Sequence, residues 1–188
     1  MKQFIKKHFY KVIAILIALC IIFITIGSIY PYSFAGIDKN IEYNPNNKVL
    51  DEYKNDITYF KNQLNSQDLN SSKKGTIEKT LNLFSNPIFM KKDTSKVSKT
   101  DLEKFNNEIN SLVIELRNSI KENGKTLSID EFNSIETLKS RFEEYHEWLS
   151  SYLNSPFVSE KKWNEILNKF HESLLIDLKE LKIFYKDK

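Results

Sequence analysis

The chain has 188 residues, 40% of them hydrophobic and 28% charged, a balance that excludes collagen-like and intrinsically disordered proteins. The formal net charge is +3, and its positive excess comes from four lysines before the first apolar run: Lys2, Lys6, Lys7 and Lys11. Without these four, 24 basic residues stand against 25 acidic ones, so the remainder lacks the basic face of a nucleic-acid-binding protein and no nucleic-acid partner is expected.

The first predicted element is a transmembrane helix over residues 12–30. Its 19 residues carry no charge, and as a helix they would be roughly 28 Å long, close to the thickness of a bilayer's hydrocarbon core. Aromatic residues flank both ends, as in the headgroup zone, and Pro31 marks the expected end of the helix. Because the lysines all precede it, we predict that residues 1–11 form a basic cytoplasmic flank and that the C-terminal part is extracytoplasmic.

Two alternatives compete with this signal-anchor. Ser33 and Ala35 are small residues suited to signal cleavage after Ala35, which would release a secreted protein. The apolar run exceeds the usual length of a cleaved signal, about 7–15 residues, and this favours the anchor. A lipoprotein modified at Cys20 is excluded, because Leu19 is too large for the preceding position. Cys20 is the only cysteine, so one chain can form no disulfide, and we interpret it as a small apolar side chain.

Residues 31–46 have no hydrophobic period and are predicted to be a tether. A helix is predicted from Asn47, since large apolar residues recur at helical spacing: Leu50, Tyr53, Ile57, Phe60 and Leu64. We expect a loop over 66–75, a short helix over 76–85 and another loop over 86–99.

Three further helices are predicted from their start signals. Thr100 with Glu103, and Ser128 with Glu131, have the spacing of capping boxes, while Ser159 caps the last helix. Their apolar stripes are Leu102, Phe105, Ile109, Leu112, Leu116 and Ile120, then Phe132, Ile135, Leu138, Phe142, Tyr145, Leu149 and Tyr152, and finally Trp163, Leu167, Phe170, Leu174, Leu178 and Leu181. Asn123-Gly124 and Ser155-Pro156 are the expected ends of the first two.

These patterns predict an all-α protein. No stretch alternates convincingly enough to predict a strand. The connections 123–128 and 155–159 are short, so the last three helices should run up-down-up as antiparallel neighbours. Residues 47–188 are therefore expected to form an antiparallel helical bundle of about four long helices and one short helix.

A metal site is the sharpest chemical candidate and is not supported. Glu143 and His146 form one Glu-x-x-His motif, but a di-iron bundle needs two, and Asn168 stands three residues before His171. The sequences His146-Glu147 and His171-Glu172 begin a zinc-protease motif whose second histidine is missing in both cases. His8 is interpreted as an interfacial residue.

Other chemistry has equally weak support. The chain has neither a Gly-x-Ser-x-Gly elbow nor a glycine-rich phosphate loop. Trp148 and Trp163 could anchor a partner, although core packing is the simpler interpretation. Four helical carboxylates are interpreted as a solvated face: Glu103, Glu108, Glu115 and Glu122.

We therefore predict no catalytic residues, no cofactor, no metal and no enzymatic activity. The leading hypothesis is a single-pass membrane protein whose extracytoplasmic helical domain binds another protein in the cell envelope. The alternatives are a secreted helical effector released by cleavage after Ala35 and a metal-dependent enzyme built around Glu143 and His146.

Overall fold

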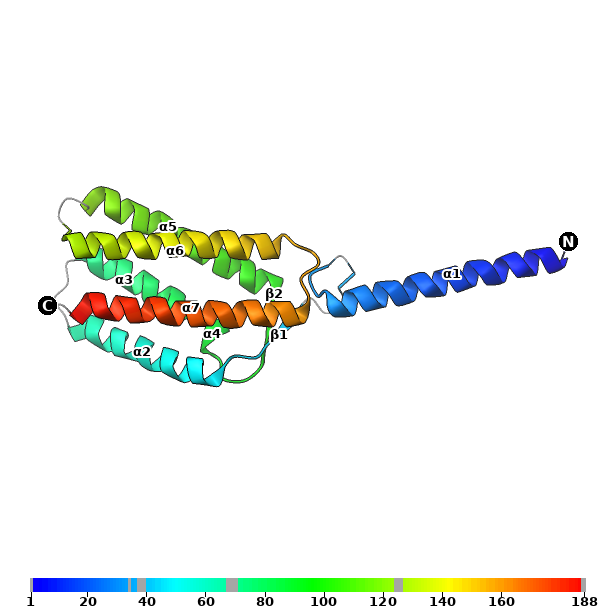
Figure 1. Cartoon of the computed structure of the whole chain (residues 1–188), viewed down its shortest axis with the longest axis horizontal. Helices are drawn as coiled ribbons and strands as arrows, with labels where there is room; N and C mark the ends of the chain where they lie inside the picture. The colour runs from blue at the N-terminus through cyan, green and yellow to red at the C-terminus, as the bar shows by residue number, and fades with distance from the viewer. Residues whose placement is uncertain (1, 34, 37–39, 67–70, 124–126, 187–188) are drawn as a thin grey trace.

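A single helix projects from one end of a helical bundle in the computed structural model, which describes residues 2–33, 35–36, 40–66, 71–123 and 127–186 (Figure 1). The projecting helix is α1 (Lys2–Ile29). The bundle contains α2 (Asn47–Ser66), α3 (Ser71–Phe84), α4 (Pro87–Met90), α5 (Lys99–Asn123), α6 (Ile129–Leu153) and α7 (Glu160–Lys186). Two short strands, β1 (Asn40–Tyr43) and β2 (Ser95–Ser98), complete the fold. The all-α prediction is confirmed.

Helix α1 is long and apolar enough to cross a membrane over the 21 residues Phe9–Ile29. Only 6% of its most apolar stretch is buried inside the protein, and side chains such as Ile15 and Ile24 are more than half exposed. An apolar surface of this size is unfavourable in water, so it needs either a bilayer or removal with a signal. The predicted transmembrane segment is thus helical, and its helix begins earlier than expected, at Lys2.

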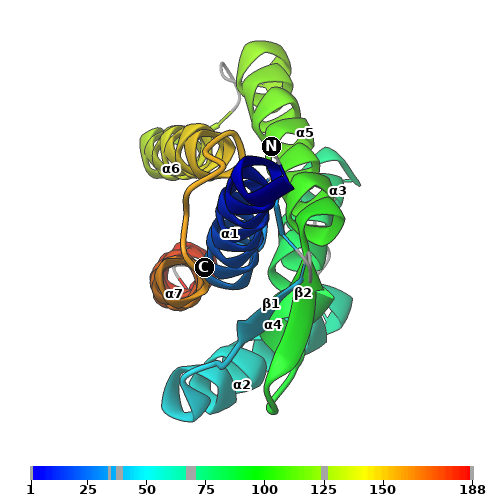
Figure 2. The same cartoon turned by 90° about the vertical axis from the view of Figure 1, so that its right-hand side faces the viewer.

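Five helices close a ring in the order α6, α5, α3, α2, α7 and back to α6, as the view along the bundle shows (Figure 2). Helices α5, α6 and α7 alternate in direction, in agreement with the predicted up-down-up arrangement (Figure 1). Helices α2 and α7 are neighbours that both run away from α1. We call the end from which α1 leaves the α1 end, and the opposite end, where α6 begins, the far end.

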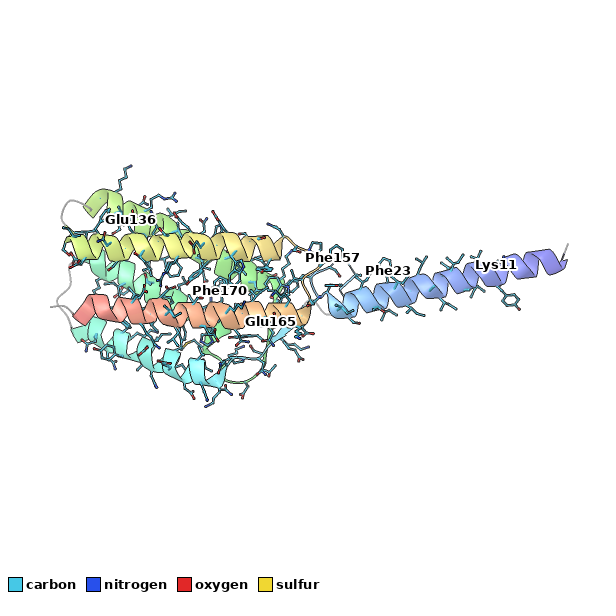
Figure 3. The ribbon with its side chains drawn as sticks, in the orientation of Figure 1. Lys11, Phe23, Glu136, Phe157, Glu165 and Phe170 are labelled. Atoms are coloured by element: carbon cyan, nitrogen blue, oxygen red, sulfur yellow. The ribbon has the colours of Figure 1, made fainter. Side chains whose placement is uncertain are left out.

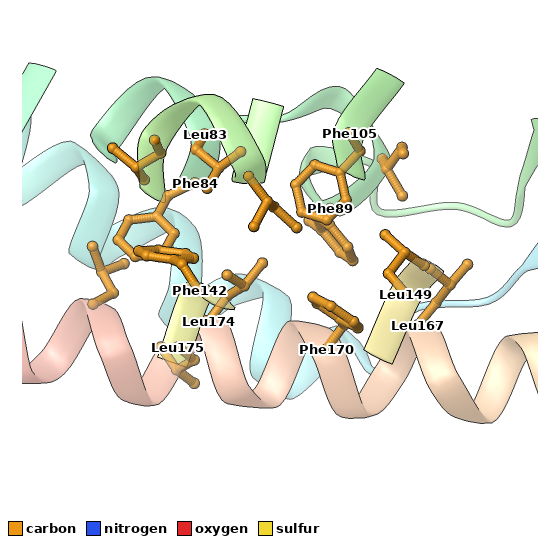
Figure 4. Close-up of a cluster of buried hydrophobic side chains, with 14 of the residues drawn as sticks. Leu83, Phe84, Phe89, Phe105, Phe142, Leu149, Leu167, Phe170, Leu174 and Leu175 are labelled. Carbon is orange, nitrogen blue, oxygen red and sulfur yellow. The ribbon is translucent and has the colours of Figure 1, made fainter. Parts of the chain in front are cut away.

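The core of the ring is filled by aromatic and aliphatic side chains from all five helices and α4 (Figure 4). Phe89 of α4 contacts Phe105 of α5, whose ring in turn contacts Phe170 of α7, with centroid separations of 5.2 and 6.1 Å. All three are fully buried or nearly so. At roughly 1.5–3 kcal/mol per buried large side chain, such a core is a main source of stability.

The two strands correct the prediction that the chain contains none. They pair antiparallel, with Ile41 opposite Val97 and Tyr43 opposite Ser95. Ile41, Tyr43 and Val97 face the core while Glu42 and Lys96 face outward. Buried and exposed side chains do alternate, but over only four residues in each strand. A pattern this short does not predict a strand within a polar segment. β1 lies inside the predicted tether and β2 inside the predicted loop 86–99.

Side chains of α7 form hydrogen bonds with the backbone of β1 and of the residues after it, along the edge opposite β2. Glu160, Asn164 and Asn168 are spaced four residues apart, about 6 Å along a helix, which nearly matches the two-residue repeat of an extended chain. The Glu160 carboxylate accepts from the backbone N–H of Glu42 at 3.0 Å. The amide oxygens of the two asparagines accept from the backbone N–H groups of Asn44 and Asn46, and their NH₂ groups donate to the carbonyls of Glu42 and Asn44.

Two of the three predicted helix starts are confirmed. Ser128 and Glu131 form a complete capping box, and Ser159 Oγ accepts from the Lys162 backbone N–H at 3.3 Å. The prediction at Thr100 and Glu103 is wrong: the helix begins at Lys99, and Ser98 and Asp101 make the reciprocal bonds instead. β2 ends at Ser98, so the cap forms where the strand turns into the helix. Helix α3 also starts earlier than predicted, at Ser71, inside the expected loop 66–75.

Candidate functional site

The proposed metal motif is engaged in contacts between α5 and α6. Glu143 accepts from Arg117 at 2.9 Å, and His146 Nδ1 lies 3.1 Å from the side-chain oxygen of Asn106. No group of three or more His, Cys, Asp or Glu side chains that could hold a metal ion occurs in the part of the chain that the structure describes. Glu143 and His146 are better explained as residues that join the two helices.

His171 lies in an aromatic enclosure inside the core. Its Nδ1 is 3.1 Å from the Tyr43 hydroxyl, and its ring stands perpendicular to that of Tyr53 at 4.7 Å and close to Phe89. Its Nε2 has no hydrogen-bond partner among the described residues. Burial lowers the pKa of His171 to about 4, so the imidazole is neutral at physiological pH. We assign the ring proton of His171 to Nε2. In this tautomer the lone pair of Nδ1 accepts a hydrogen bond from the Tyr43 hydroxyl.

A second polar group joins α6 to α7. The Asp177 carboxylate is completely buried, and it accepts from the Arg141 guanidinium and from the Tyr145 hydroxyl at 2.7 Å. Arg141 also donates to Glu180 at 2.8 Å. Burial raises the pKa of Asp177, while the bonds from Arg141 and Tyr145 act in the opposite direction. A carboxylate whose two oxygens already have partners is suited to holding helices together.

The segment after α1 is packed into the bundle, and we call this region the junction: Tyr30, Pro31, Tyr32, Ser33 and Gly36 with Phe157 and Trp163. The Tyr32 ring lies 5.3 Å from the Trp163 ring, and its hydroxyl donates to the Val97 carbonyl at 3.1 Å. Pro31 and Ser33 are buried. The start of the predicted tether is therefore part of the folded domain.

Gly36 allows the chain to turn at the junction. Its N–H donates to the Ser33 carbonyl, and Ser33 N–H donates to that of Tyr30. A Cβ atom at position 36 would lie 2.1 Å from the Pro31 carbonyl oxygen. Only glycine fits this turn without movement of the backbone.

A cleft of about 410 Å³ opens beside the junction. It is lined by two residues of α1, Gly27 and Ser28, and by Pro31, Asn40, Glu42, Lys96 and Glu160. The lining is mainly polar and carries both signs of charge. If α1 spans a bilayer, this cleft lies at the level of the lipid headgroups.

The two tryptophans pack inside the bundle. Trp163 is fully buried, and half-buried Trp148 stacks on Phe170 with centroids 5.2 Å apart. Core packing, the simpler of the two interpretations, is confirmed for Trp163.

The four helical carboxylates divide into two pairs. Glu103 and Glu122 are exposed, as expected of a solvated face. Glu108 and Glu115 are half-buried, and they bind Asn86 and Lys79 respectively. Glu115 thereby connects α5 to α3, and Glu108 connects α5 to the N-cap residue of α4, so the solvated-face interpretation is wrong for these two.

The side chain of His8, which was interpreted as interfacial, lies outside the described part of the chain. The same holds for Phe34, between the two small residues of the possible cleavage site. Cys20 is exposed on α1, where a membrane-spanning helix would present it to lipid or to another helix.

The Arg141–Asp177–Tyr145 group and the enclosure around His171 were not predicted from the sequence. One signal was available: Asp177 interrupts the apolar run Leu174–Leu178, where a charged residue requires a buried partner. Arg141, one of only two arginines in the chain, was the natural candidate. No comparable signal joins Tyr43 to His171, 128 residues apart, since their meeting depends on a strand that was not predicted.

Comparison with known proteins gives no match: no protein-family model, no curated protein and no solved structure is similar to this chain.

Proposed function

We propose that the chain is a single-pass membrane protein of the bacterial cell envelope, with a cytoplasmic N-terminus and an extracytoplasmic helical bundle that binds another protein. The junction is the observation that carries the anchoring part of this proposal. Tyr32 packs on Trp163 directly after the apolar helix ends. A helix that leaves the folded domain without a free linker is suited to a permanent attachment.

The junction also weighs against release by cleavage. A cut after Ala35 would remove Pro31, Tyr32 and Ser33 from a packed region and uncover Trp163, which is fully buried in the intact chain. A secreted domain would lose these contacts without replacement. The orientation of the anchor follows from the four lysines in the first part of α1, ahead of its apolar run, which favour the cytoplasmic side.

A binding role is supported by two exposed apolar residues at the far end. Ile129 and Phe132 lie one turn apart on α6, with exposed fractions of 79% and 37%. Positions i and i+3 share a helix face, so the two side chains form one small apolar surface. It belongs to the first turn of α6, which begins at the end of the bundle opposite α1 (Figure 1).

Mass spectrometry of the protein purified from native membranes tests the anchoring. We expect peptides that contain Met1 or Lys2 at full abundance in the membrane fraction. A mature N-terminus at Gly36, with the protein in the medium, would establish the secreted alternative instead.

Site-specific photocrosslinking in native membranes tests the binding. A photoreactive residue at Phe132 should give one discrete adduct, whereas the same residue at Ser151, which is exposed on α6 near the α1 end, should not. The mass of the adduct distinguishes a second copy of this chain from another protein. Absence of an adduct at both Ile129 and Phe132, or equal adducts at Ser151, would contradict the proposal.

A further inference from the structure

The loop between α6 and α7 displays an aromatic ring at the α1 end. Phe157 has 60% of its surface exposed, although Leu153 before it and Val158 after it are buried in the core. The loop is held by a backbone bond from Ser155 N–H to the Tyr152 carbonyl and by the Ser159 cap of α7. Its fixed backbone therefore keeps Phe157 on the surface, where a large apolar side chain in water is unfavourable.

The position of Phe157 relative to α1 indicates what covers it. Its ring meets the ring of Tyr30 edge to face, with centroids 5.7 Å apart. Tyr30 directly follows the last residue of α1, Ile29. Figure 3 shows Phe157 at the base of α1, on the side of the bundle from which the helix projects. Phe157 thus lies at the depth of Tyr30, where the apolar helix gives way to the polar domain.

We propose that Phe157, paired with Tyr30, inserts into the interfacial zone of the lipid bilayer and makes the loop 154–159 a second membrane contact of the domain. This inference rests on the proposed anchoring of α1. Tyr rings are favoured in the headgroup zone, and Phe side chains of interfacial segments are buried at the boundary between headgroups and acyl chains. The exposed residue Pro156 carries no charge that would oppose insertion.

A second contact has a consequence that a single helix cannot supply. A chain held in the bilayer by one helix can tilt as a whole relative to the membrane, whereas contact at α1 and at the loop limits that tilt. The surface of Ile129 and Phe132 would then point in one direction relative to the bilayer, and its partner would meet it in a restricted geometry.

Spin labelling of the full chain, reconstituted in vesicles of phosphatidylethanolamine and phosphatidylglycerol, tests the proposal. Cys20→Ser removes the only cysteine, and a nitroxide is then attached in turn at Phe157→Cys, at Phe23→Cys within α1 and at Ile129→Cys at the far end. Collision with oxygen reports lipid, and collision with a water-soluble nickel chelate reports water. We expect the ratio of oxygen collision to nickel collision at position 157 to be several-fold higher than at position 129 and lower than at position 23.

The outcomes separate this inference from the proposed anchoring. A label at 157 that is as accessible to nickel as the label at 129, while 23 is in lipid, overturns the second contact and leaves the anchor intact. A label at 23 in water overturns both.

A second variant removes the effect of replacing Phe157 itself. A nitroxide at Pro156→Cys should lose its lipid accessibility when Phe157→Ser is added, and unchanged accessibility would contradict the role of the ring.

Discussion

The buried histidine makes the stability of the bundle depend on pH. His171 has a pKa of about 4 in the folded protein because burial disfavours its charged form, whereas an unfolded chain protonates it near the ordinary value of about 6.5. Between these two values the unfolded state binds the extra proton. The contribution of His171 is thus fully present above pH 6.5 and is lost as the pH falls toward 4.

Between pH 7 and pH 5 we predict a loss of about 2 kcal/mol of unfolding free energy, at about 1.4 kcal/mol for each pH unit below 6.5. Urea unfolding of the full chain in detergent, followed by the fluorescence of the core tryptophans at pH 7 and pH 5, measures it. His171→Asn, whose amide oxygen can still accept from Tyr43, is the control and should show a clearly smaller pH dependence. An equal dependence in both proteins would show that other groups are responsible.

The buried carboxylate of Asp177 predicts an asymmetric response to mutation. Arg141→Met should destabilise the bundle by roughly 2–4 kcal/mol, because it leaves a buried charge without its main partner. Arg141→Met combined with Asp177→Leu should recover most of that stability, since an apolar pair needs no desolvation of charge. Chemical denaturation of the single and double variants decides the matter, and a double variant less stable than Arg141→Met would contradict this interpretation of the group.

At the scale of elements, α7 does more than fill one place in the ring. Its asparagines substitute for a third strand at the edge of β1, and thereby connect the segment after α1 to the longest helix of the bundle. Asn164→Ala and Asn168→Ala should each cost roughly 0.5–1.5 kcal/mol of stability. Lys169→Ala, at an exposed position on the same helix, is the matched control, with an expected change within about 0.5 kcal/mol. Equal effects at all three positions would mean that these bonds contribute nothing specific.

At this scale, helices could be predicted where their hydrophobic pattern extends over many residues. Helices α2, α5, α6 and α7 carry apolar stripes over many turns, and their existence, class and order followed from the sequence. β1 and β2 alternate over four residues each, and they form because Ile41, Tyr43 and Val97 find a shared place in the core. The cap at Ser98 was missed for the same reason, since it depends on where β2 ends.

The candidate site could be predicted only in part. The apolar segment that becomes α1 was evident from its composition. The junction was not, because the contact of Tyr32 with Trp163 joins residues more than a hundred positions apart and leaves no local pattern. Phe157 likewise has no periodic signal, because it lies in the loop between α6 and α7.

For the whole molecule, the junction predicts that residues before Ala35 stabilise the bundle. A chain that begins at Gly36 should have an unfolding free energy roughly 2–4 kcal/mol lower than one that begins at Tyr30, because it lacks the packing of Tyr32 on Trp163. Urea unfolding of the two chains measures the difference. Tyr32→Ala in the longer chain should reproduce most of the difference. Equal stability of the two chains would remove the argument against cleavage.

In the proposed topology, α1 anchors the chain and the bundle lies outside the cytoplasm. Its most direct test is the labelling of intact cells that express the Cys20→Ser, Ile129→Cys chain with a maleimide that cannot cross membranes. We predict that the cysteine at position 129, which is at the far end of the bundle, is labelled before lysis, on a full-length protein that sediments with the membranes. Labelling only after lysis, or a labelled protein that is shortened and found in the medium, would contradict the account.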